Sequence, residues 1–335
     1  MNGQALKDEI RDAVSLRTIG LVAGVLLLQL AFIASYVGAF HHPVPHDITV
    51  GVVAPAGQAR AIADRLDSLE GRPLDARVVS DAATARDQVS HGDLVAALLV
   101  DPGSPKDTLL VASGGGSSLA TAVEQVLTDV DAGQQRSLTV TDVVPLQPGD
   151  ARGLSGFYLV IGWLVGGYLV ASLLGVAKGA RPANRRRAAI RLASTVPYAV
   201  ASGLGGALVV DQGFGALTGH FWALSGLGTL LVLSAATTTM AFQVLFGTIG
   251  IGLTVLLFVV LGNPSAGGAY QNQLLPGLWR TLGPLLPNGA GTEAVRQIIY
   301  FGGGIGSQLL VVTAFIVVGA AVTALATRAR TGADA

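Results

Sequence analysis

The stretch that decides the fold runs from Phe221 to Gly262 and reads FWALSGLGTLLVLSAATTTMAFQVLFGTIGIGLTVLLFVVLG. It contains no Asp, Glu, Lys or Arg. One helix of this length would be about 60 Å long, about twice the thickness of the hydrocarbon core of a bilayer. We therefore expect two membrane crossings joined by a turn within 243–248, where Gln243 and Gly247 interrupt the apolar run. Such a hairpin would expose a large apolar surface in water, so it indicates a membrane protein.

The overall composition supports this prediction. Of the 335 residues, 51% are hydrophobic and 13% are charged, and Lys and Arg balance Asp and Glu. A net charge of zero provides no basic field for nucleic acid, so the expected partner is the lipid bilayer and no nucleic acid is expected. Cysteine is absent, which excludes disulfides, thiolate metal sites and catalytic thiols.

We predict a mainly α membrane protein with six transmembrane helices. Besides the hairpin, four apolar segments are long enough to cross a bilayer, namely 18–40, 154–177, 192–210 and 305–327. Residues 1–17 carry apolar side chains near helical spacing, which is typical of a helix in the membrane interface or of a solvated N-terminal helix. After the first span, the transmembrane domain is expected over 153–327, followed by a tail over 328–335.

Between the first and second spans, residues 41–152 predict a small α/β domain with a mixed sheet, because strand-like and helical patterns alternate there. The predicted strands are 48–53, 74–79, 94–100, 108–111 and 139–144, and the predicted helices are 56–69, 81–90 and 118–135. Asp81 is the expected N-cap of the second helix, since its carboxylate can accept from backbone N–H groups of the first turn.

Basic residues predict the orientation. The segment 178–191 contains no acid and six basic residues, namely Lys178, Arg181, Arg185, Arg186, Arg187 and Arg191. Cytoplasmic loops are rich in Lys and Arg, so we place this segment in the cytoplasm. Counting spans outward from it places both termini in the cytoplasm and 41–152 and 263–304 outside. The protein is therefore expected in the cell membrane as a multi-pass protein.

The sequence offers no set of enzymatic residues. The predicted spans hold no acidic or basic side chain, which argues against a proton- or ion-coupled carrier. The motif SGGGSS at 113–118 lacks the lysine of a phosphate-binding loop, and it predicts a strand-to-helix turn with a Ser N-cap. His41, His42 and His46 are expected in a solvated linker rather than at a metal. We expect no catalytic residue, no cofactor and no metal.

The residues that follow the hairpin, 263–304, contain many Gly and Pro residues but are too apolar for a solvated loop. Their prolines break a continuous helix, and irregular backbone is tolerated at membrane depth only where protein or water pairs its polar groups. We therefore expect short re-entrant pieces that form an outer gate, with a rigid lid as the alternative. The candidate gate residues are Pro264, Gly267, Gly268, Pro276, Trp279, Pro284, Pro287 and Arg296.

The motifs in this segment resemble the YhgE/Pip family, also called phage infection protein-like. They are NPSAGG at 263–268, LLP at 274–276, LGPLLP at 282–287 and AVR at 294–296. Residues 82–100 are similar to a second pattern common in these proteins, and the resemblance in span arrangement covers almost the whole chain. That family belongs with the membrane subunits of type-2 ABC exporters, which implies a separate ATPase in contact with 1–17 and 178–191. The implied coupling residues are Arg181, Arg185, Arg186, Arg187 and Arg191, and binding of the same arginines to anionic lipid is the alternative.

These features predict the permease subunit of an ABC-type exporter. It would work with a separate ATPase, as a homodimer or as a heterodimer with a similar permease. The substrate is expected to be amphiphilic or lipid-like, because the spans offer apolar walls without charge. The alternative is a non-transporting membrane scaffold or receptor, of the kind used in envelope assembly or phage adsorption, that presents 41–152 to a partner.

Overall fold

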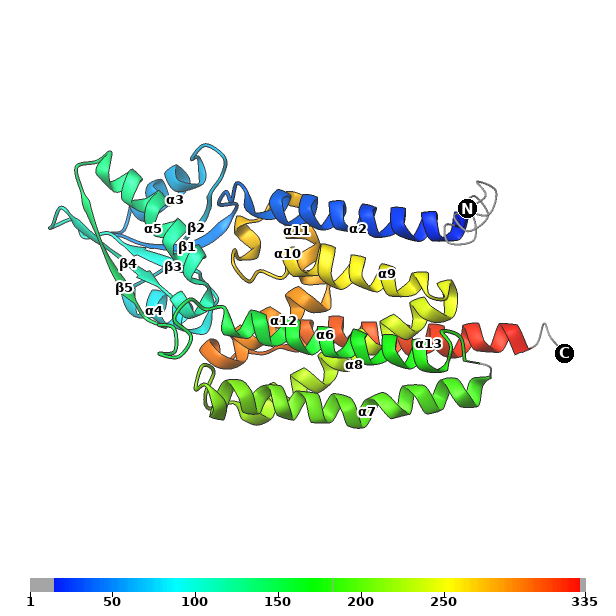
Figure 1. Ribbon diagram of the computed structural model, residues 1–335. Coiled ribbons are helices and arrows are strands. Elements are labelled where there is room, and N and C mark those ends of the chain that lie inside the picture. The colour runs from blue at the N-terminus through cyan, green and yellow to red at the C-terminus, as the bar shows by residue number, and fades with distance from the viewer. Residues whose placement is uncertain (1–14, 183, 332–335) are drawn as a thin grey trace.

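The computed structural model describes residues 15–182 and 184–331, in an elongated arrangement with an α/β domain at one end and a bundle of long helices at the other (Figure 1). The start of helix α2 (Leu16–Phe40), the connection from α6 (Ser155–Lys178) to α7 (Arg185–Leu208) and the end of α13 (Gly306–Thr331) all lie at the end opposite the α/β domain (Figure 1).

Within the described residues, five helices are long and apolar enough to cross a membrane. They are α2, α6, α7, α8 (Phe221–Phe246) and α13, and α7 continues into a π-helical turn, η2 (Val209–Gly213). These helices are compatible with a multi-pass membrane protein. Their apolar composition agrees with the sequence prediction, whereas the number of long spans does not reach the predicted six.

The difference lies in the second half of the predicted hairpin. Helix α8 ends at Phe246, and Gly247 adopts a positive φ of 67°. This break lies within the turn predicted at 243–248, and α9 (Ile249–Val255) begins directly after it. Helix α9 continues through the π-helical segment η3 (Leu256–Gly262) into α10 (Asn263–Ser265). The resulting apolar helix, Ile249–Ser265, is shorter than the other five.

Among the long helices, two boundaries differ from the predicted ones by a helical turn or more. Helix α7 begins at Arg185 rather than at 192, because Asn184 is an effective N-cap whose side chain accepts from Arg187 N at 2.9 Å, and Arg is a good helix former. Three predicted loop arginines therefore lie in the first turns of a helix. Helix α13 extends to Thr331 and so enters the segment predicted as a tail, 328–335. The predicted interface helix over 1–17 falls almost entirely outside the described residues.

The α/β domain contains a five-stranded mixed sheet of order β2-β1-β3-β4-β5, as the alternation of strands and helices predicted. The β3–β4 pair is antiparallel and the other pairs are parallel. Its strands are β1 (Ile48–Val53), β2 (Leu74–Val78), β3 (Ala96–Leu99), β4 (Lys106–Val111) and β5 (Ser137–Asp142). Its helices are α3 (Ala59–Asp67), α4 (Ala82–His91) and α5 (Ser117–Ala132), and Asp81 caps α4 as predicted, accepting from Thr84 N at 2.9 Å.

The helices cover both faces of the sheet. Helices α3 and α5 pack on one face through side chains such as Leu66 and Leu127, and α4 packs on the other through Val89. A separate apolar core lies inside the helical bundle around Trp163. The Trp163 indole donates to Ser202 O at 3.0 Å, and its ring fills space that Cβ atoms at Gly206 and Gly228 would occupy.

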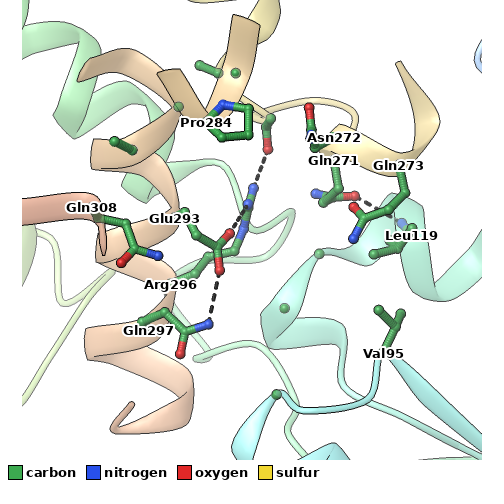
Figure 2. Close-up of a pocket in the computed structure, with 18 of the residues that line it drawn as sticks. Val95, Leu119, Gln271, Asn272, Gln273, Pro284, Glu293, Arg296, Gln297 and Gln308 are labelled. Atoms are coloured by element: carbon green, nitrogen blue, oxygen red, sulfur yellow. Dashed lines mark hydrogen bonds and ion pairs between the residues drawn. The ribbon is translucent and has the colours of Figure 1, made fainter. Parts of the chain in front are cut away.

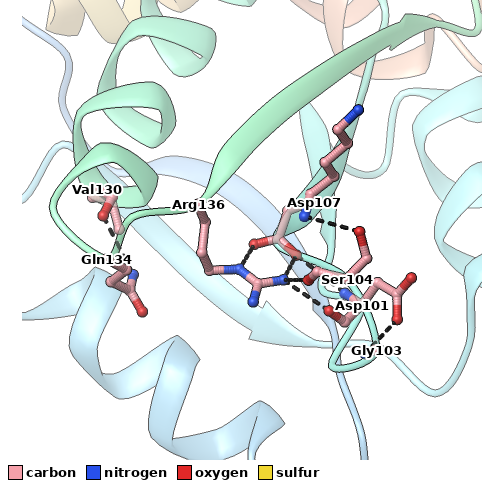
Figure 3. Close-up of polar contacts among 8 residues, drawn as sticks. Asp101, Gly103, Ser104, Asp107, Val130, Gln134 and Arg136 are labelled. Atoms are coloured by element: carbon pink, nitrogen blue, oxygen red, sulfur yellow. Dashed lines mark hydrogen bonds and ion pairs between the residues drawn. The ribbon is translucent and has the colours of Figure 1, made fainter.

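Within the α/β domain, Arg136 and Asp107 form an ion pair (Figure 3). Arg136, which lies just before β5, donates twice to the buried Asp107 carboxylate, each time at 2.6 Å. The same guanidinium donates to the carbonyl groups of Asp101 and Ser104, at 2.8 and 2.9 Å. Because these carbonyl groups belong to the β3–β4 connection, a bidentate pair and two further bonds join that turn to the start of the edge strand.

Candidate functional site

Residues 263–304 form a chain of short helices, which we call the outer segment. After α10 come η4 (Asn272–Leu274), α11 (Gly277–Leu282), η5 (Gly283–Leu285), α12 (Pro287–Arg296) and the π-helical turn η6 (Gln297–Phe301). The prolines occupy helix starts, where a missing N–H leaves no intrahelical bond unmade. Pro264, Pro284 and Pro287 lie in the first turn of α10, η5 and α12, and Pro276 is the N-cap of α11. The sequence predicts short pieces here, and the structure has short helices.

Helix α12 is buried among the long helices. Ala290, Ala294 and Val295 belong to the same apolar core as Trp163. A Cβ at Gly291 would lie 2.9 Å from a methyl group of Leu231 and 3.0 Å from one of Val160, so glycine lets α12 approach α8 and α6 closely. Its burial excludes a solvated loop and makes α12 a wedge between α6 and α8.

The buried side chain of Asn288 satisfies backbone freed by the π-helical segment. Its Nδ2 donates to Phe258 O at 2.9 Å and to Asn263 Oδ1 at 2.8 Å. A π-helical turn shifts the hydrogen-bond pattern, so a carbonyl group at such a turn needs another donor. The Asn288 side chain also fills the space beside Gly262, where a Cβ would overlap it.

Two glycines shape the ends of the outer segment. Gly267 has a φ of 70° and Gly302 a φ of 60°, both in the left-handed region that favours glycine. Arg296, which is 8% exposed, donates to the carbonyl group of Gly267 and, at 3.3 Å, to the Glu293 carboxylate. Gln297 Nε2 donates to the other Glu293 oxygen at 3.0 Å. Arg296 therefore holds the turn that follows α10 against α12.

A cavity of about 370 Å³ lies between the outer segment and the α/β domain (Figure 2). The outer segment and the start of α13 provide its amide and charged side chains, which are Gln271, Asn272, Gln273, Glu293, Arg296, Gln297 and Gln308. The α/β domain contributes apolar and glycine residues, among them Val95, Leu119 and Gly116. The cavity volume lies within the range of about 300–1,000 Å³ that is usual for small-molecule sites.

The SGGGSS turn is where the α/β domain contacts the outer segment. A Cβ at Gly114 would lie 2.5 Å from the Tyr300 ring, and one at Gly115 would lie 2.9 Å from the Phe301 ring. Gly116, at a φ of 147°, faces the Gln271 side chain, whose Oε1 accepts from Leu119 N at 3.0 Å. The predicted Ser N-cap is wrong, because Gly116 occupies the cap position of α5. These glycines permit close approach between two parts of the chain.

Further contacts join the two parts. Tyr300 donates to the buried Asp150 carboxylate at 2.9 Å, and burial, followed by the nearby Asp150 charge, raises the pKa of the Tyr300 phenol above its ordinary value. The Leu274 side chain lies in the core of the α/β domain with the residues of α3 and α5. His46 N donates to Gln273 O at 2.9 Å. The outer segment is thus connected to the α/β domain by backbone, side-chain and core contacts.

Helix α2 contacts the outer segment through Trp279. The Trp279 indole donates to Ser35 Oγ at 3.0 Å, and its ring lies against Gly38, where a Cβ would be 2.7 Å away. Most of the remaining surface of α2 is not covered by protein, as its exposed Leu, Ile and Val side chains show. The indole therefore anchors the C-terminal end of α2 to α11.

A second concavity, which we call the apolar groove, lies between α8 and α13. Its volume is about 310 Å³. It is lined by Thr238, Ala241, Phe242 and Leu245 of α8, Leu257 of η3, and Ala314, Phe315, Val318, Gly319 and Val322 of α13. Among the described residues that line it, Thr238 alone carries a hydroxyl group, and the others are apolar or glycine. This groove therefore suits an apolar chain rather than a polar solute.

The predicted ATPase-coupling arginines divide into two groups. Arg191 donates to the carbonyl groups of Gly179 and Lys178, each at 2.8 Å, and so caps the C-terminal end of α6. Arg181 donates to Leu245 O at 3.3 Å. Arg186 and Arg187 are exposed at the start of α7, and Arg185 provides its first residue. Two of the five thus bond to carbonyl groups of the chain itself, whereas Arg186 and Arg187 present their charge outward.

The predicted gate residues all lie in the outer segment but have different contacts. Gly267, Pro284 and Arg296 line the cavity. Gly268 is held against the Phe157 ring of α6, and Trp279 lies against α2. Sequence reasoning missed the amides of the cavity, although the QNQ run at 271–273 is an unusual polar cluster in an apolar stretch. In the part of the chain that the structure describes, no group of three or more His, Cys, Asp or Glu could hold a metal ion.

Comparison of this chain with protein-family models, with curated proteins and with solved structures finds no match.

Proposed function

We propose that this chain is the membrane subunit of an exporter driven by a separate ATPase, and that its substrate is amphiphilic. The observation that carries the proposal is the position of the outer segment. It is wedged between α6 and α8, anchors α2, and borders a cavity beneath the α/β domain. A segment with these contacts can seal a path through the bundle and can move when the long helices rearrange.

The same proposal includes an orientation. The start of α7 lies at the end of the bundle opposite the α/β domain (Figure 1). It carries the exposed Arg186 and Arg187, so we assign this end to the cytoplasm and the domain to the outside. The helix Ile249–Ser265 then forms the sixth crossing. Its 17 residues span about 26 Å, which is near the lower limit for a membrane helix.

The chemistry of the walls supports an amphiphile. The central parts of the long helices carry no acidic or basic residue, and the apolar groove opens between two of them. The amide-rich cavity lies at the end of the bundle nearest the α/β domain (Figure 2). ATP-driven closure of two ATPase subunits would push on the basic end of α6 and α7 in a dimer, and α12, packed against α6, would transmit this movement to the cavity.

The test is co-purification of the chain with candidate ATPases from the same cell, followed by measurement of ATP hydrolysis. A stable complex whose hydrolysis depends on Arg186 and Arg187 is the expected result. If no ATPase forms a complex and none is stimulated, the exporter proposal fails. The resemblance to YhgE/Pip proteins supports the choice of a type-2 ABC partner.

A scaffold or receptor is the second candidate function, and the open edge of the sheet favours it. Strand β5 pairs with β4 on one side, and most of its residues are exposed. An extended segment of a partner could add to such an edge by main-chain hydrogen bonds. This alternative predicts partner capture by the α/β domain without any ATPase.

A further inference from the structure

The cavity beneath the α/β domain is lined by an unusual number of amides. Gln271, Asn272 and Gln273 face it from one side, and Gln297 and Gln308 face it from the other (Figure 2). Each amide carries both a donor and an acceptor, so a ring of amides suits hydroxyl groups, which also donate and accept. Asn272 Oδ1 is buried without a hydrogen-bond partner in the described structure and can accept from a bound hydroxyl.

The charges at the cavity are paired with each other. Among the described residues that line it, Glu293 and Arg296 are the acidic and basic ones, and they form an ion pair at 3.3 Å. Arg296 also donates to Gly267 O, and Gln297 donates to Glu293. Because this ion pair leaves neither charge without a partner, the cavity suits a neutral polar group better than a phosphate or an ammonium group.

The cavity and the apolar groove lie on successive turns of one face of α13. Gln308 and Val311 line the cavity, and Phe315, Val318 and Val322 line the groove. Residues spaced by three or four positions share a helix face, so this face changes from polar to apolar along its length. From Gln308 to Val322 the helix rises by about 21 Å, most of the thickness of the hydrocarbon core of a bilayer.

We propose that the chain binds a glycolipid, with its neutral, hydroxyl-rich headgroup in the cavity and an acyl chain in the apolar groove. The inference rests on the proposed function, because it names the substrate class of the exporter. Continuity along one face of α13 is the argument for this occupant. A second protein chain would fill the groove but would leave the amides of the cavity unused.

The experiment uses the full chain in lipid nanodiscs without any ATPase. The probe is a diacyl glucosylglycerol that carries a photoactivatable diazirine in one acyl chain, and a diacyl phosphatidylglycerol with the same diazirine is the comparison. We expect saturable cross-linking of the glucolipid to 314–322 of α13 and to 238–245 of α8. Unlabelled glucolipid should compete for this labelling, and unlabelled phosphatidylglycerol should compete far less.

Two substitutions test the two parts of the site separately. Gln308→Leu should weaken glucolipid binding about three- to tenfold through loss of one hydrogen bond, and Gln134→Leu, at an exposed position in the α/β domain, should not.

Ala314→Trp should fill the groove and abolish the α13 cross-link. Ala324→Trp, exposed on a face of the same helix away from the groove, should leave the cross-link unchanged. Thermal unfolding of each variant identifies any that has lost its fold. Gln297→Met then replaces Gln308→Leu as the cavity variant, and Ala241→Leu replaces Ala314→Trp as the groove variant.

Equal competition by the two lipids would overturn the headgroup assignment. Cross-links confined to the uncovered face of α2, or unchanged labelling of folded Gln308→Leu and Ala314→Trp proteins, would overturn the site as a whole. Because this assay contains no ATPase, glucolipid binding without any ATPase complex would refute the exporter while leaving the site intact. An ATPase complex without glucolipid binding would refute the site alone.

Discussion

At the scale of single residues, buried polar side chains in the outer segment bond to backbone groups that irregular helices leave without partners. Asn288 donates a hydrogen bond to the carbonyl group of Phe258, and Arg296 donates one to that of Gly267. Each bond lies between segments that are distant in sequence. Irregular backbone among apolar helices is stable when side chains pair its polar groups in this way. An unpaired carbonyl group buried among apolar side chains would cost free energy.

Replacement of Asn288 by Leu tests this role. The variant keeps the branched shape of the side chain but leaves the Phe258 carbonyl group and Asn263 Oδ1 without their donor. We therefore expect a loss of about 1–3 kcal/mol in the free energy of unfolding. Thermal or denaturant unfolding in detergent measures the loss. Thr313→Leu, at an exposed position of α13, serves as the control and should change stability little. An Asn288→Leu protein as stable as the wild type would contradict the assigned role.

A second residue-scale prediction concerns Asp131 in the α/β domain, which is 2% exposed and whose Oδ2 has no hydrogen-bond partner in the described structure. Burial, and then the charge of Asp107, raises its pKa above the ordinary 3.8. Between the unfolded and folded pKa values the folded protein binds more protons, so the contribution of this group to stability falls as the pH rises through that window. Asp131→Asn removes the buried charge and should stabilise the protein at neutral pH.

Unfolding midpoints measured from about pH 4 upward should therefore fall less steeply in Asp131→Asn than in the wild type. Asp129→Asn changes an exposed carboxylate two residues away and should keep the wild-type pH dependence. If both variants follow the wild-type curve, Asp131 does not carry this penalty.

At the scale of elements, α12 links the long helices to the cavity and to the α/β domain. It packs between α6 and α8, and its continuation carries Tyr300 and Phe301 to the glycine turn of the α/β domain. Movement of α6 would therefore shift a wall of the cavity. It would also shift Tyr300 and Phe301, on which the glycine turn of the α/β domain packs. The sequence left a moving gate and a rigid lid open, and these contacts are compatible with both.

A disulfide between α6 and α12 separates the gate from the lid. A Cβ at Gly156 would lie 3.5 Å from the Val295 Cβ, within the distance of about 3.5–4.5 Å that disulfides require. The double variant Gly156→Cys, Val295→Cys should form this bond cleanly, because the chain has no cysteine of its own. We expect the oxidised protein to fold, to bind its ATPase and to lose export.

Reduction of the same protein should restore export, and each single cysteine variant provides a further control. Full export by the oxidised double variant would establish a rigid lid. Oxidation is checked by the altered mobility of a fragment pair after cleavage between the two positions.

At the scale of the whole molecule, the chain separates its chemistry along one axis. The α/β domain lies at one end, and the start of α7 lies at the other (Figure 1). The amide-rich cavity adjoins the α/β domain, and Arg186 and Arg187 are exposed at the start of α7. Apolar helices join the two ends. This polarity is what a protein needs if a cytoplasmic motor is to act on a site at the outer surface.

The orientation is tested by single cysteines in the cysteine-free chain. Ser68→Cys, exposed in the α/β domain, should react with a membrane-impermeant maleimide in intact cells. Arg186→Cys, exposed at the start of α7, should react only after the membrane is permeabilised. Labelling of Arg186→Cys in intact cells would reverse the assigned orientation, and the maleimide should leave the parent chain unlabelled.

Much of the candidate site could be located from the sequence but not assembled from it. The prolines and the apolar residues of 263–304 predicted short helices, because proline excludes a continuous one. The contacts of Gly114–Gly116 with Tyr300, Phe301 and Gln271 could not be predicted, since the turn reads equally well as a simple strand-to-helix connection. The run of basic residues also placed Arg191 in a loop, whereas it lies within α7 and donates to carbonyl groups at the end of α6.

The sequence by itself determined the apolar helices, the turn near Gly247 and the mixed sheet, because each follows from local hydrophobic periodicity, helix caps and segment length. The tertiary structure alone decided that α12 enters the bundle, that Leu274 joins the core of the α/β domain, and that five amides surround one cavity. These outcomes depend on the packing of residues far apart in the chain, and local patterns do not record which apolar surface a segment covers.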